Sequence, residues 1–411
     1  MNYQEMMENA KTCMGPYCKA CDVCNGRVCR NQMPGPGSKG IGDTAMRNYD
    51  KWKEIRVNMD CLCKKKDTDT TFELFGKTFD YPIFAGPVGA VNLHYGDKMN
   101  DMEYNDILVS GCVIAGIAAF TGDGTNPDVV KAAAAAIAKV DGLGIPTIKP
   151  WNKETIDEKM AQVRESNAFA VAMDIDAAGL PFLKNMNPPA GAKSVKEMKE
   201  IIESAGVPFI VKGIMTVEGA KKALEAGAAG IVVSNHGGRV LDQCPATAEV
   251  LKEIADAVKG QMKIFVDGGI RSGVDVFKAL AMGADAVIIA RPYVTSVYGG
   301  GEEGVVGPDD GIHMEHFVEI DAFADHGVAF GLRLRIEAAE DLAAEALDGA
   351  GGDDALRRTA GAHHHVHVHA GVHHHEGTGH VAVGMQGDAR TGLADLGDNL
   401  LGRLMGHIEV E

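Results

Sequence analysis

Long apolar runs are absent from this chain of 411 residues, of which 45% are hydrophobic and 24% charged. No stretch approaches the roughly 18 apolar residues of a membrane-spanning helix, so we expect no membrane span. Basic residues are also scarce, since 40 Lys and Arg stand against 57 Asp and Glu for a formal net charge of −17. This balance disfavours nucleic acid and anionic lipid as partners, although a local basic pocket could still hold a small anion.

Cysteine is too rare for a disulfide scaffold, with nine residues in the whole chain. Five of the nine crowd into residues 13–29, which indicates metal or redox chemistry. The N-terminal sequence MNYQEMMENAKTC lacks the basic and apolar stretches of a secretory signal. We therefore expect a cytoplasmic protein.

The composition divides the chain into three stretches. Residues 1–66 form a Cys-rich N-terminal extension, in which Met33–Gly42 (MPGPGSKGIG) is expected to be a loop. Residues 67–303 alternate short β-branched runs with segments of helical period, which is typical of β-α units and a parallel sheet. Residues 304–411 form a tail of different composition.

Eight apolar runs in the middle stretch are candidate strands. They are Pro82–Val88, Cys112–Ile117, Pro146–Trp151, Phe169–Ile175, Pro208–Ile214, Gly230–Ser234, Lys263–Val266 and Ala286–Ala290. Helical patterns separate several of them, at Lys153–Ser166, Val195–Ala205, Val217–Ala226, Thr247–Val258 and Val274–Met282. This alternation predicts an α/β fold, a (β/α)8 TIM barrel, with its active site at the carboxyl ends of the strands.

The tail is unusual because it contains no Lys or Cys and holds thirteen of the fifteen His. Three interpretations stay open: a separate histidine-rich tail, a disordered low-complexity extension, or the product of a shifted reading frame or joined fragment. The closely spaced imidazoles of His363–His380 could chelate Zn²⁺, Ni²⁺ or Cu²⁺.

A glycine-rich turn follows the seventh candidate strand. Residues Asp267–Gly273 read DGGIRSG and lead into a helical pattern. Glycines let the backbone approach a phosphate, and the start of a helix offers free N–H groups. Arg271 and, after the eighth strand, Arg291 add positive charge. Loops after the last two strands of such barrels recurrently bind phosphate, so we expect a phosphate site here.

A His and an Arg follow the sixth candidate strand, in Ser234–Arg239 (SNHGGR). His236 can remove a proton near neutral pH, and Arg239 can bind a carboxylate with two parallel hydrogen bonds. Lys212 ends the fifth strand and adds a positive charge, while Asp174 ends the fourth and can hold the imidazolium of His236. Together these residues suit chemistry on a small carboxylate.

These motifs resemble the FMN-dependent 2-hydroxy-acid oxidase and dehydrogenase family, which includes glycolate oxidase, lactate oxidase and the flavocytochrome lactate dehydrogenases. The resemblance covers about residues 45–303 and rests on SNHGGR and DGGIRSG. It implies oxidation of a small 2-hydroxy carboxylate to the 2-oxo acid, with His236 as base, Asp174 as its partner and Arg239 as carboxylate anchor. It also implies that Lys212 contacts the flavin. The other implied FMN contacts are Gly86, Pro87, Val88, Ser234, Asp267, Gly268, Gly269, Arg271, Ala290 and Arg291.

The chain departs from the family pattern at three places. Lys149 stands where the family has a substrate-binding Tyr, so it is expected to contact the substrate. A second carboxylate-binding Arg after Asp174 and an N-terminal Tyr are not recognisable. Two alternatives therefore stay open: another FMN barrel chemistry, such as an isopentenyl-diphosphate isomerase-like reaction, and a non-enzymatic flavin or metal electron-transfer or sensor protein.

The cysteine module has the spacing C-x4-C-x2-C-x2-C-x4-C over Cys13, Cys18, Cys21, Cys24 and Cys29. Its central run resembles part of a ferredoxin-type iron–sulfur site, and four thiolates could equally hold one Zn²⁺. A reduced segment without metal is the remaining interpretation. A cluster would let flavin electrons pass one at a time to an electron-transfer protein. We also expect a homo-oligomer.

Overall fold

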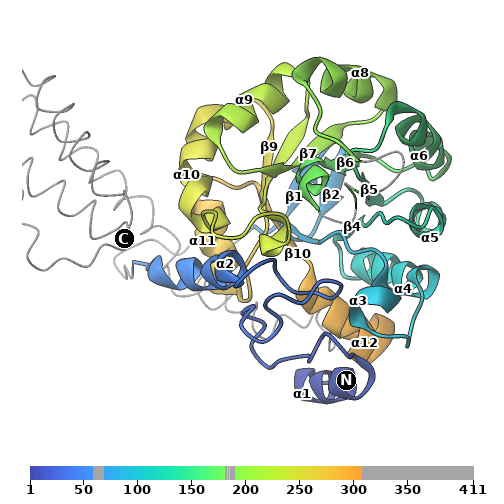
Figure 1. Cartoon of the computed structure of the whole chain (residues 1–411), viewed down its shortest axis with the longest axis vertical. Helices are drawn as coiled ribbons and strands as arrows, with labels where there is room; N and C mark the ends of the chain where they lie inside the picture. Colours follow the sequence, from blue (N-terminus) through green and yellow to red (C-terminus); the bar gives the residue numbers. More distant parts are fainter. Residues whose placement is uncertain (59–68, 181–182, 184, 186–189, 308–411) are drawn as a thin grey trace, which may run out of the picture. The chain divides into compact units, whose positions relative to one another are not determined.

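The computed structural model describes residues 1–58, 69–180, 183, 185 and 190–307. Its centre is a closed barrel of parallel strands in the order β10-β3-β4-β5-β6-β7-β8-β9. Figure 1 shows the helices arranged around this barrel. The predicted (β/α)8 barrel is confirmed.

The barrel strands are short and almost wholly buried, as expected of a parallel sheet covered by helices. They are β3 (Ile83–Ala85), β4 (Ala118–Thr121), β5 (Gly144–Ile148), β6 (Val171–Asp174), β7 (Phe209–Ile214), β8 (Gly230–Val233), β9 (Lys263–Val266) and β10 (Ala286–Ile289). The register between β6 and β7 pairs Asp174 with Lys212, so two predicted site residues lie side by side where their strands end.

Helices follow the strands in regular alternation. They are α3 (Val91–Tyr95), α4 (Asp101–Ile114), α5 (Asp128–Ala138), α6 (Lys153–Glu165), α8 (Val195–Ala205), α9 (Val217–Glu225), α10 (Thr247–Val258), α11 (Gly273–Ala281) and α12 (Arg291–Val306), with 3-10 turns η1 (Ile175–Gly179) and η2 (His236–Gly238). Side-chain caps fix several starts: Ser194 accepts from the N–H of Glu197, and Ser272 accepts from that of Asp275. Such caps stabilise a helix by about 1 kcal/mol each.

One predicted strand is wrong. Cys112 to Ile114, which open the predicted strand Cys112–Ile117, form the last turn of α4, and the strand itself is β4. Asn100 starts α4 with a capping box to Glu103, and the helix then runs through a continuously apolar segment. A buried helix and a buried strand cannot be told apart in such a run by periodicity alone.

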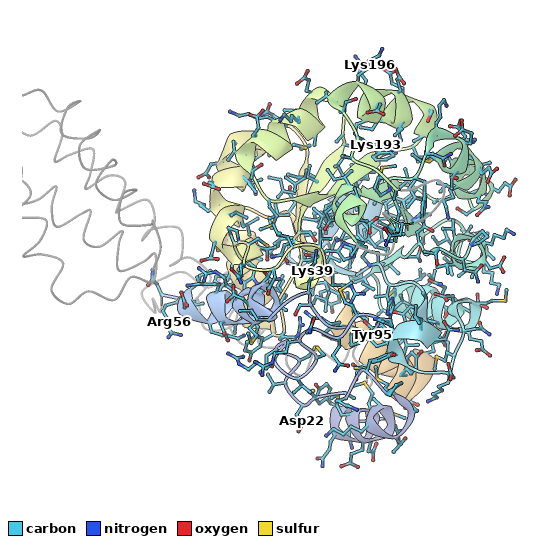
Figure 2. The ribbon with its side chains drawn as sticks, in the orientation of Figure 1. Asp22, Lys39, Arg56, Tyr95, Lys193 and Lys196 are labelled. Carbon is cyan, nitrogen blue, oxygen red and sulfur yellow. The ribbon has the colours of Figure 1, made fainter. Side chains whose placement is uncertain are left out.

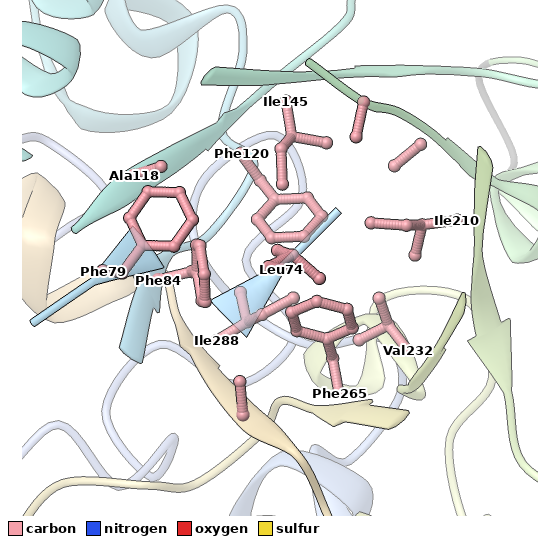
Figure 3. Close-up of a cluster of buried hydrophobic side chains, with 13 residues drawn as sticks. Leu74, Phe79, Phe84, Ala118, Phe120, Ile145, Ile210, Val232, Phe265 and Ile288 are labelled. Carbon is pink, nitrogen blue, oxygen red and sulfur yellow. The ribbon is translucent and has the colours of Figure 1, made fainter. Parts of the chain in front are cut away.

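The barrel interior is packed with aromatic rings (Figure 3). Phe84, Phe120 and Phe265 contact one another edge to face, with ring centroids 5.6 to 6.0 Å apart. A hairpin that the sequence did not reveal, β1 (Phe72–Leu74) with β2 (Lys77–Phe79), adds to the same cluster. The hairpin closes one end of the barrel core and leaves the carboxyl end for a site.

The N-terminal extension packs on the barrel through two helices. Helix α1 (Tyr3–Cys13) packs against α12, and α2 (Asp43–Glu54) packs against α10 and α11. The segment between α1 and α2 contains neither helix nor strand, so the loop predicted for Met33–Gly42 is confirmed. No helix within the described ranges is both long and apolar enough to cross a bilayer. Beyond Gly307, the predicted tail lies outside the described residues, as does the histidine-rich segment.

Candidate active site

A cavity of about 650 Å³ opens at the carboxyl ends of the barrel strands. This volume is within the range of small-molecule and cofactor sites. Most predicted site residues line it: Pro87, Val88, Lys149, Asp174, Lys212, His236, Arg239, Asp267, Gly268, Gly269, Arg271, Ala290 and Arg291. Gly86 and Ser234 lie directly beneath the wall: Gly86 packs on Ala290, and Ser234 is fully buried.

The carboxylate that holds His236 is Asp176, which differs from the sequence prediction. His236 Nδ1 lies 3.2 Å from Asp176 Oδ2 and 3.9 Å from Asp174 Oδ2. Burial alone would raise the pKa of Asp176, but the charges of His236 and Lys212 outweigh it and lower this pKa. Asp176 is therefore an anion behind the imidazole.

A bulge in β7 makes room for Asp176. The register of β7 against β8 shifts between Lys212 and Ile214, and Gly213 between them has a φ of +102°. A Cβ on Gly213 would lie 2.7 Å from the Cβ of Asp176. Only glycine therefore permits the turn η1 to bring Asp176 against His236.

Asp174 pairs instead with Lys149, the residue expected to contact substrate. Lys149 Nζ lies 3.1 Å from Asp174 Oδ2, and both side chains are almost fully buried. Asp123 fixes the chain around Lys149: it accepts hydrogen bonds from the Lys149 N–H, from Trp151 Nε1 and from Lys159 Nζ. The pair is thus held on the cavity wall by a rigid polar network.

A second polar chain runs through Lys212. Its Nζ donates to Ser234 Oγ at 2.9 Å, and Ser234 Oγ donates to Asp267 Oδ2 at 2.8 Å. Burial would lower the pKa of Lys212, but Asp267, Asp176 and Asp174 outweigh it and raise this pKa. Lys212 therefore presents a fixed positive charge to the cavity at neutral pH.

Arg239 contacts the N-terminal loop, a relationship that the sequence did not reveal. Its Nη1 donates to the carbonyl oxygens of Gly35 and Gly37 at 2.6 and 2.9 Å. His94 Nδ1 accepts from the Gly35 N–H at 2.9 Å. The loop therefore forms one wall of the cavity, and Lys39, which also lines it, is labelled near the middle of the barrel in Figure 2.

The far end of the cavity is built for an anion. Arg271 and Arg291 line it beside Gly268 and Gly269, and α11 begins after them. Within the part of the chain that the structure describes, the buried Arg291 Nη1 has no hydrogen-bond partner. A buried guanidinium N–H without a hydrogen bond lowers the stability of the fold unless a ligand accepts that hydrogen bond. This end of the cavity therefore fits a phosphate.

Helix α2 supports both of the loops that the sequence singled out. Asn48 exchanges side-chain hydrogen bonds with Asn235, and Trp52 Nε1 donates to the Gly268 carbonyl at 2.8 Å. Gly269 packs so closely on α2 that a Cβ would lie 1.9 Å from the Asn48 carbonyl oxygen. The N-terminal extension thus fixes the SNHGGR and DGGIRSG loops in place.

The structure separates Cys13 from the other four cysteines of the predicted module. Cys18, Cys21, Cys24 and Cys29 line a second, smaller cavity beside Arg291. Cys13 Sγ instead lies 3.2 Å from the Tyr298 carbonyl oxygen, away from that cavity. All seven described cysteines are free thiols.

Fold and cavity together define a (β/α)8 barrel protein with a built anion site at its carboxyl end. The chain belongs to the FMN-dependent dehydrogenase family, whose model matches residues 36–185 and 180–307. FMN is the cofactor of this family. Arg271 and Arg291 suit its phosphate. Asp267 Oδ1, which has no hydrogen-bond partner among the described residues, can accept a hydrogen bond from a hydroxyl or N–H group of the cofactor.

Relatives with known names include plant oxidases. A peroxisomal (S)-2-hydroxyacid oxidase of Arabidopsis thaliana is 51% identical over 113 residues, which span 28% of this chain and 30% of the relative. A peroxisomal (S)-2-hydroxy-acid oxidase of Oryza sativa subsp. japonica is 34% identical over 290 residues, 64% of this chain and 78% of the relative. The chain thus spans under a third of the first relative and most of the second.

Solved structures give the same architecture. A lactate oxidase of Pediococcus acidilactici is 25% identical with a TM-score of 0.62, over 81% of this chain and 93% of that one. A mandelate oxidase variant with an FMN adduct is 27% identical with a TM-score of 0.58, over 74% of this chain and 96% of that one.

Proposed function

We propose that this protein oxidises a small 2-hydroxy carboxylate to the 2-oxo acid. The observation that carries the proposal is the pairing of His236 with the buried carboxylate of Asp176 in a cavity that also presents Arg239. FMN supplies the two-electron acceptor for this oxidation. The names of the relatives, which are 2-hydroxy-acid, lactate and mandelate oxidases, support the same chemistry.

His236 is proposed as the base. Asp176 occupies Nδ1, so Nε2 is the nitrogen that takes a proton from the substrate. Asp176 orients the ring and stabilises the imidazolium, as a buried carboxylate does behind a catalytic His. His236 removes either the hydroxyl proton or the Cα proton of the substrate. Both routes give the same 2-oxo acid.

Positive charge for the substrate carboxylate comes from Arg239 and Lys149. Arg239 Nη1 is bound to the loop, which leaves its other nitrogens for a carboxylate. Lys149 Nζ lies on the cavity wall with Asp174 as its counter-charge. Lys149 stands in place of the family's Tyr, so we propose that this site selects its substrate by charge more than by hydroxyl contacts.

The remaining cavity residues are proposed as FMN contacts. Arg271, Arg291, Gly268 and Gly269 hold the phosphate. Lys212, Ser234 and Asp267 form the polar chain beside the polar groups of the cofactor. Pro87, Val88 and Ala290 face the ring system, and Gly86 supports Ala290 from beneath.

An anaerobic visible spectrum of the purified chain tests the proposal. Glycolate, lactate and mandelate are added in turn, and the flavin bands should bleach with at least one acid. His236→Asn should retain FMN and lose the bleaching, because an amide cannot take the proton. Bands that persist through the whole panel, or bleaching that survives in His236→Asn, would contradict the assignment.

The alternatives are less well supported. Neither isomerase-like chemistry nor a non-enzymatic role is favoured, because the named relatives are oxidases.

We propose a cytoplasmic location because the seven described free thiols suit a reducing compartment. A homo-oligomer and an electron-transfer partner stay predictions.

A further inference from the structure

Four of the five N-terminal cysteines gather around one small cavity. Cys18, Cys21, Cys24 and Cys29 line it, in the spacing C-x2-C-x2-C-x4-C. Cys13 is excluded, since its Sγ contacts the Tyr298 carbonyl oxygen and lies 3.5 Å from Lys98 Nζ. The fold thus selects four thiols, the number that one zinc ion or one iron–sulfur cluster takes.

The separation of the sulfur atoms distinguishes between these two ligands. Zinc, with bonds of about 2.3 Å in a tetrahedron, holds its sulfur ligands about 3.8 Å apart. Within the described part of the chain, no three cysteine sulfurs lie within 4.8 Å of one another. A cubane cluster has an iron at each of four corners, so it holds its thiolates farther apart than a single ion does. The described cysteine sulfurs are therefore not arranged as they would be around a single zinc ion.

Positive charge faces the same cavity. Arg291 lines it, and Arg271 Nε donates to the Cys24 carbonyl oxygen at 2.9 Å with Nη2 3.7 Å from Cys24 Sγ. A [4Fe–4S]²⁺ core with four thiolates carries a charge of about −2, which two guanidinium groups can balance.

The small cavity adjoins the cofactor cavity. Pro36, Tyr95 and Arg291 line both, so they form the wall between them. Figure 2 labels Tyr95, one of these three residues, and Asp22, which lies between Cys21 and Cys24 in the sequence. A group bound by the cysteines would therefore lie next to the anion end of the FMN site.

We propose that Cys18, Cys21, Cys24 and Cys29 ligate a [4Fe–4S] cluster beside the phosphate end of the cofactor cavity. The site is complete within one chain and does not depend on which acid the barrel oxidises. Metal binding displaces the protons of these thiols.

The test uses the full chain, produced with iron and purified without oxygen. Iron, acid-labile sulfide, zinc and FMN are measured in the same sample. We expect about four iron and four sulfide per chain, and an electron paramagnetic resonance signal after reduction with dithionite. Zinc in place of iron, or FMN-loaded protein without either metal, would overturn the proposal.

Matched variants assign the ligands. Cys21→Ser and Cys29→Ser should each lose most of the iron and sulfide, whereas Cys13→Ser and Cys244→Ser should retain both. FMN content reports whether each variant keeps its barrel. Equal iron loss in Cys13→Ser and Cys21→Ser would contradict the four-cysteine site. If the ligand variants fail to fold, the metal content of the unaltered chain still decides.

Discussion

Asp176 Oδ2 lies 3.2 Å from His236 Nδ1, and this contact places a buried anion behind the proposed base. Asp174, two residues earlier, turns to Lys149 instead. Two carboxylates separated by one residue thus have different partners, and each can be tested separately.

Asp176→Asn should lower kcat by about 10²- to 10³-fold and leave KM within a few-fold. The amide can still contact the ring but cannot stabilise the imidazolium. Steady-state kinetics on the acid that bleaches the flavin measures both constants. A fall in FMN content to match the fall in kcat would show a structural role instead.

Lys149→Met should destabilise the fold by about 3 kcal/mol, because it leaves the buried Asp174 carboxylate without its partner. Lys149→Met combined with Asp174→Leu should recover most of this loss, since no buried charge then remains. Urea unfolding of the two single variants and the double variant measures the coupling between them. Additive losses would contradict a direct ion pair.

Arg291→Met should weaken FMN binding by about tenfold or more, because it removes a charge-assisted hydrogen bond to the phosphate. Riboflavin, which lacks the phosphate, provides the matched control and should bind the variant and the unaltered chain alike. Fluorescence titration of the apoprotein with each flavin gives the two affinities. A similar loss for riboflavin would place Arg291 away from the phosphate.

Acidification should destabilise the fold through His94, which lies in α3 and accepts a hydrogen bond from the Gly35 N–H. Burial, with the charges of Arg239 and Lys149, lowers the pKa of His94 from 6.5 to about 4. The unfolded chain therefore binds a proton that the folded chain does not, and stability is lost as pH falls from about 6.5 to about 4. The loss is at most about 3 kcal/mol.

His94→Gln is the control for this titration, because glutamine does not ionise in that interval. Denaturant unfolding at several pH values should show a sloping free energy for the unaltered chain and a flatter one for the variant. Asp176, whose pKa is also lowered, contributes its own loss only below about pH 4. Equal slopes would exclude His94 as the group responsible.

The sequence predicted the barrel because its signals are local. Seven of the eight apolar runs overlap a strand, and α8 and α10 have the predicted bounds, with Ser194 capping α8. The strand predicted at Cys112–Ile117 failed because the apolar end of α4 carries no periodic signal. The hairpin of β1 and β2 was missed because each strand has only three residues.

Site residues that belong to a local sequence motif were predictable. Roles that depend on a contact between distant parts of the chain were not. His236, Arg239 and the DGGIRSG loop follow strands, so their place at the barrel mouth follows from the topology. The role of Asp176 depends on a bulge at Gly213, and the contact of Arg239 with Gly35 joins residues about 200 positions apart. Neither the bulge nor this contact can be recognised from the local amino-acid sequence.

Helix α2 makes the N-terminal extension inseparable from the catalytic end of the barrel. Asn48 and Trp52 hold the two loops that carry the proposed base and phosphate site. A fragment begun at β3 would retain every barrel strand and still lack the residues that shape its active end. Truncation, domain fusion or transfer of this barrel to another protein must therefore keep α2 together with the two loops that it supports.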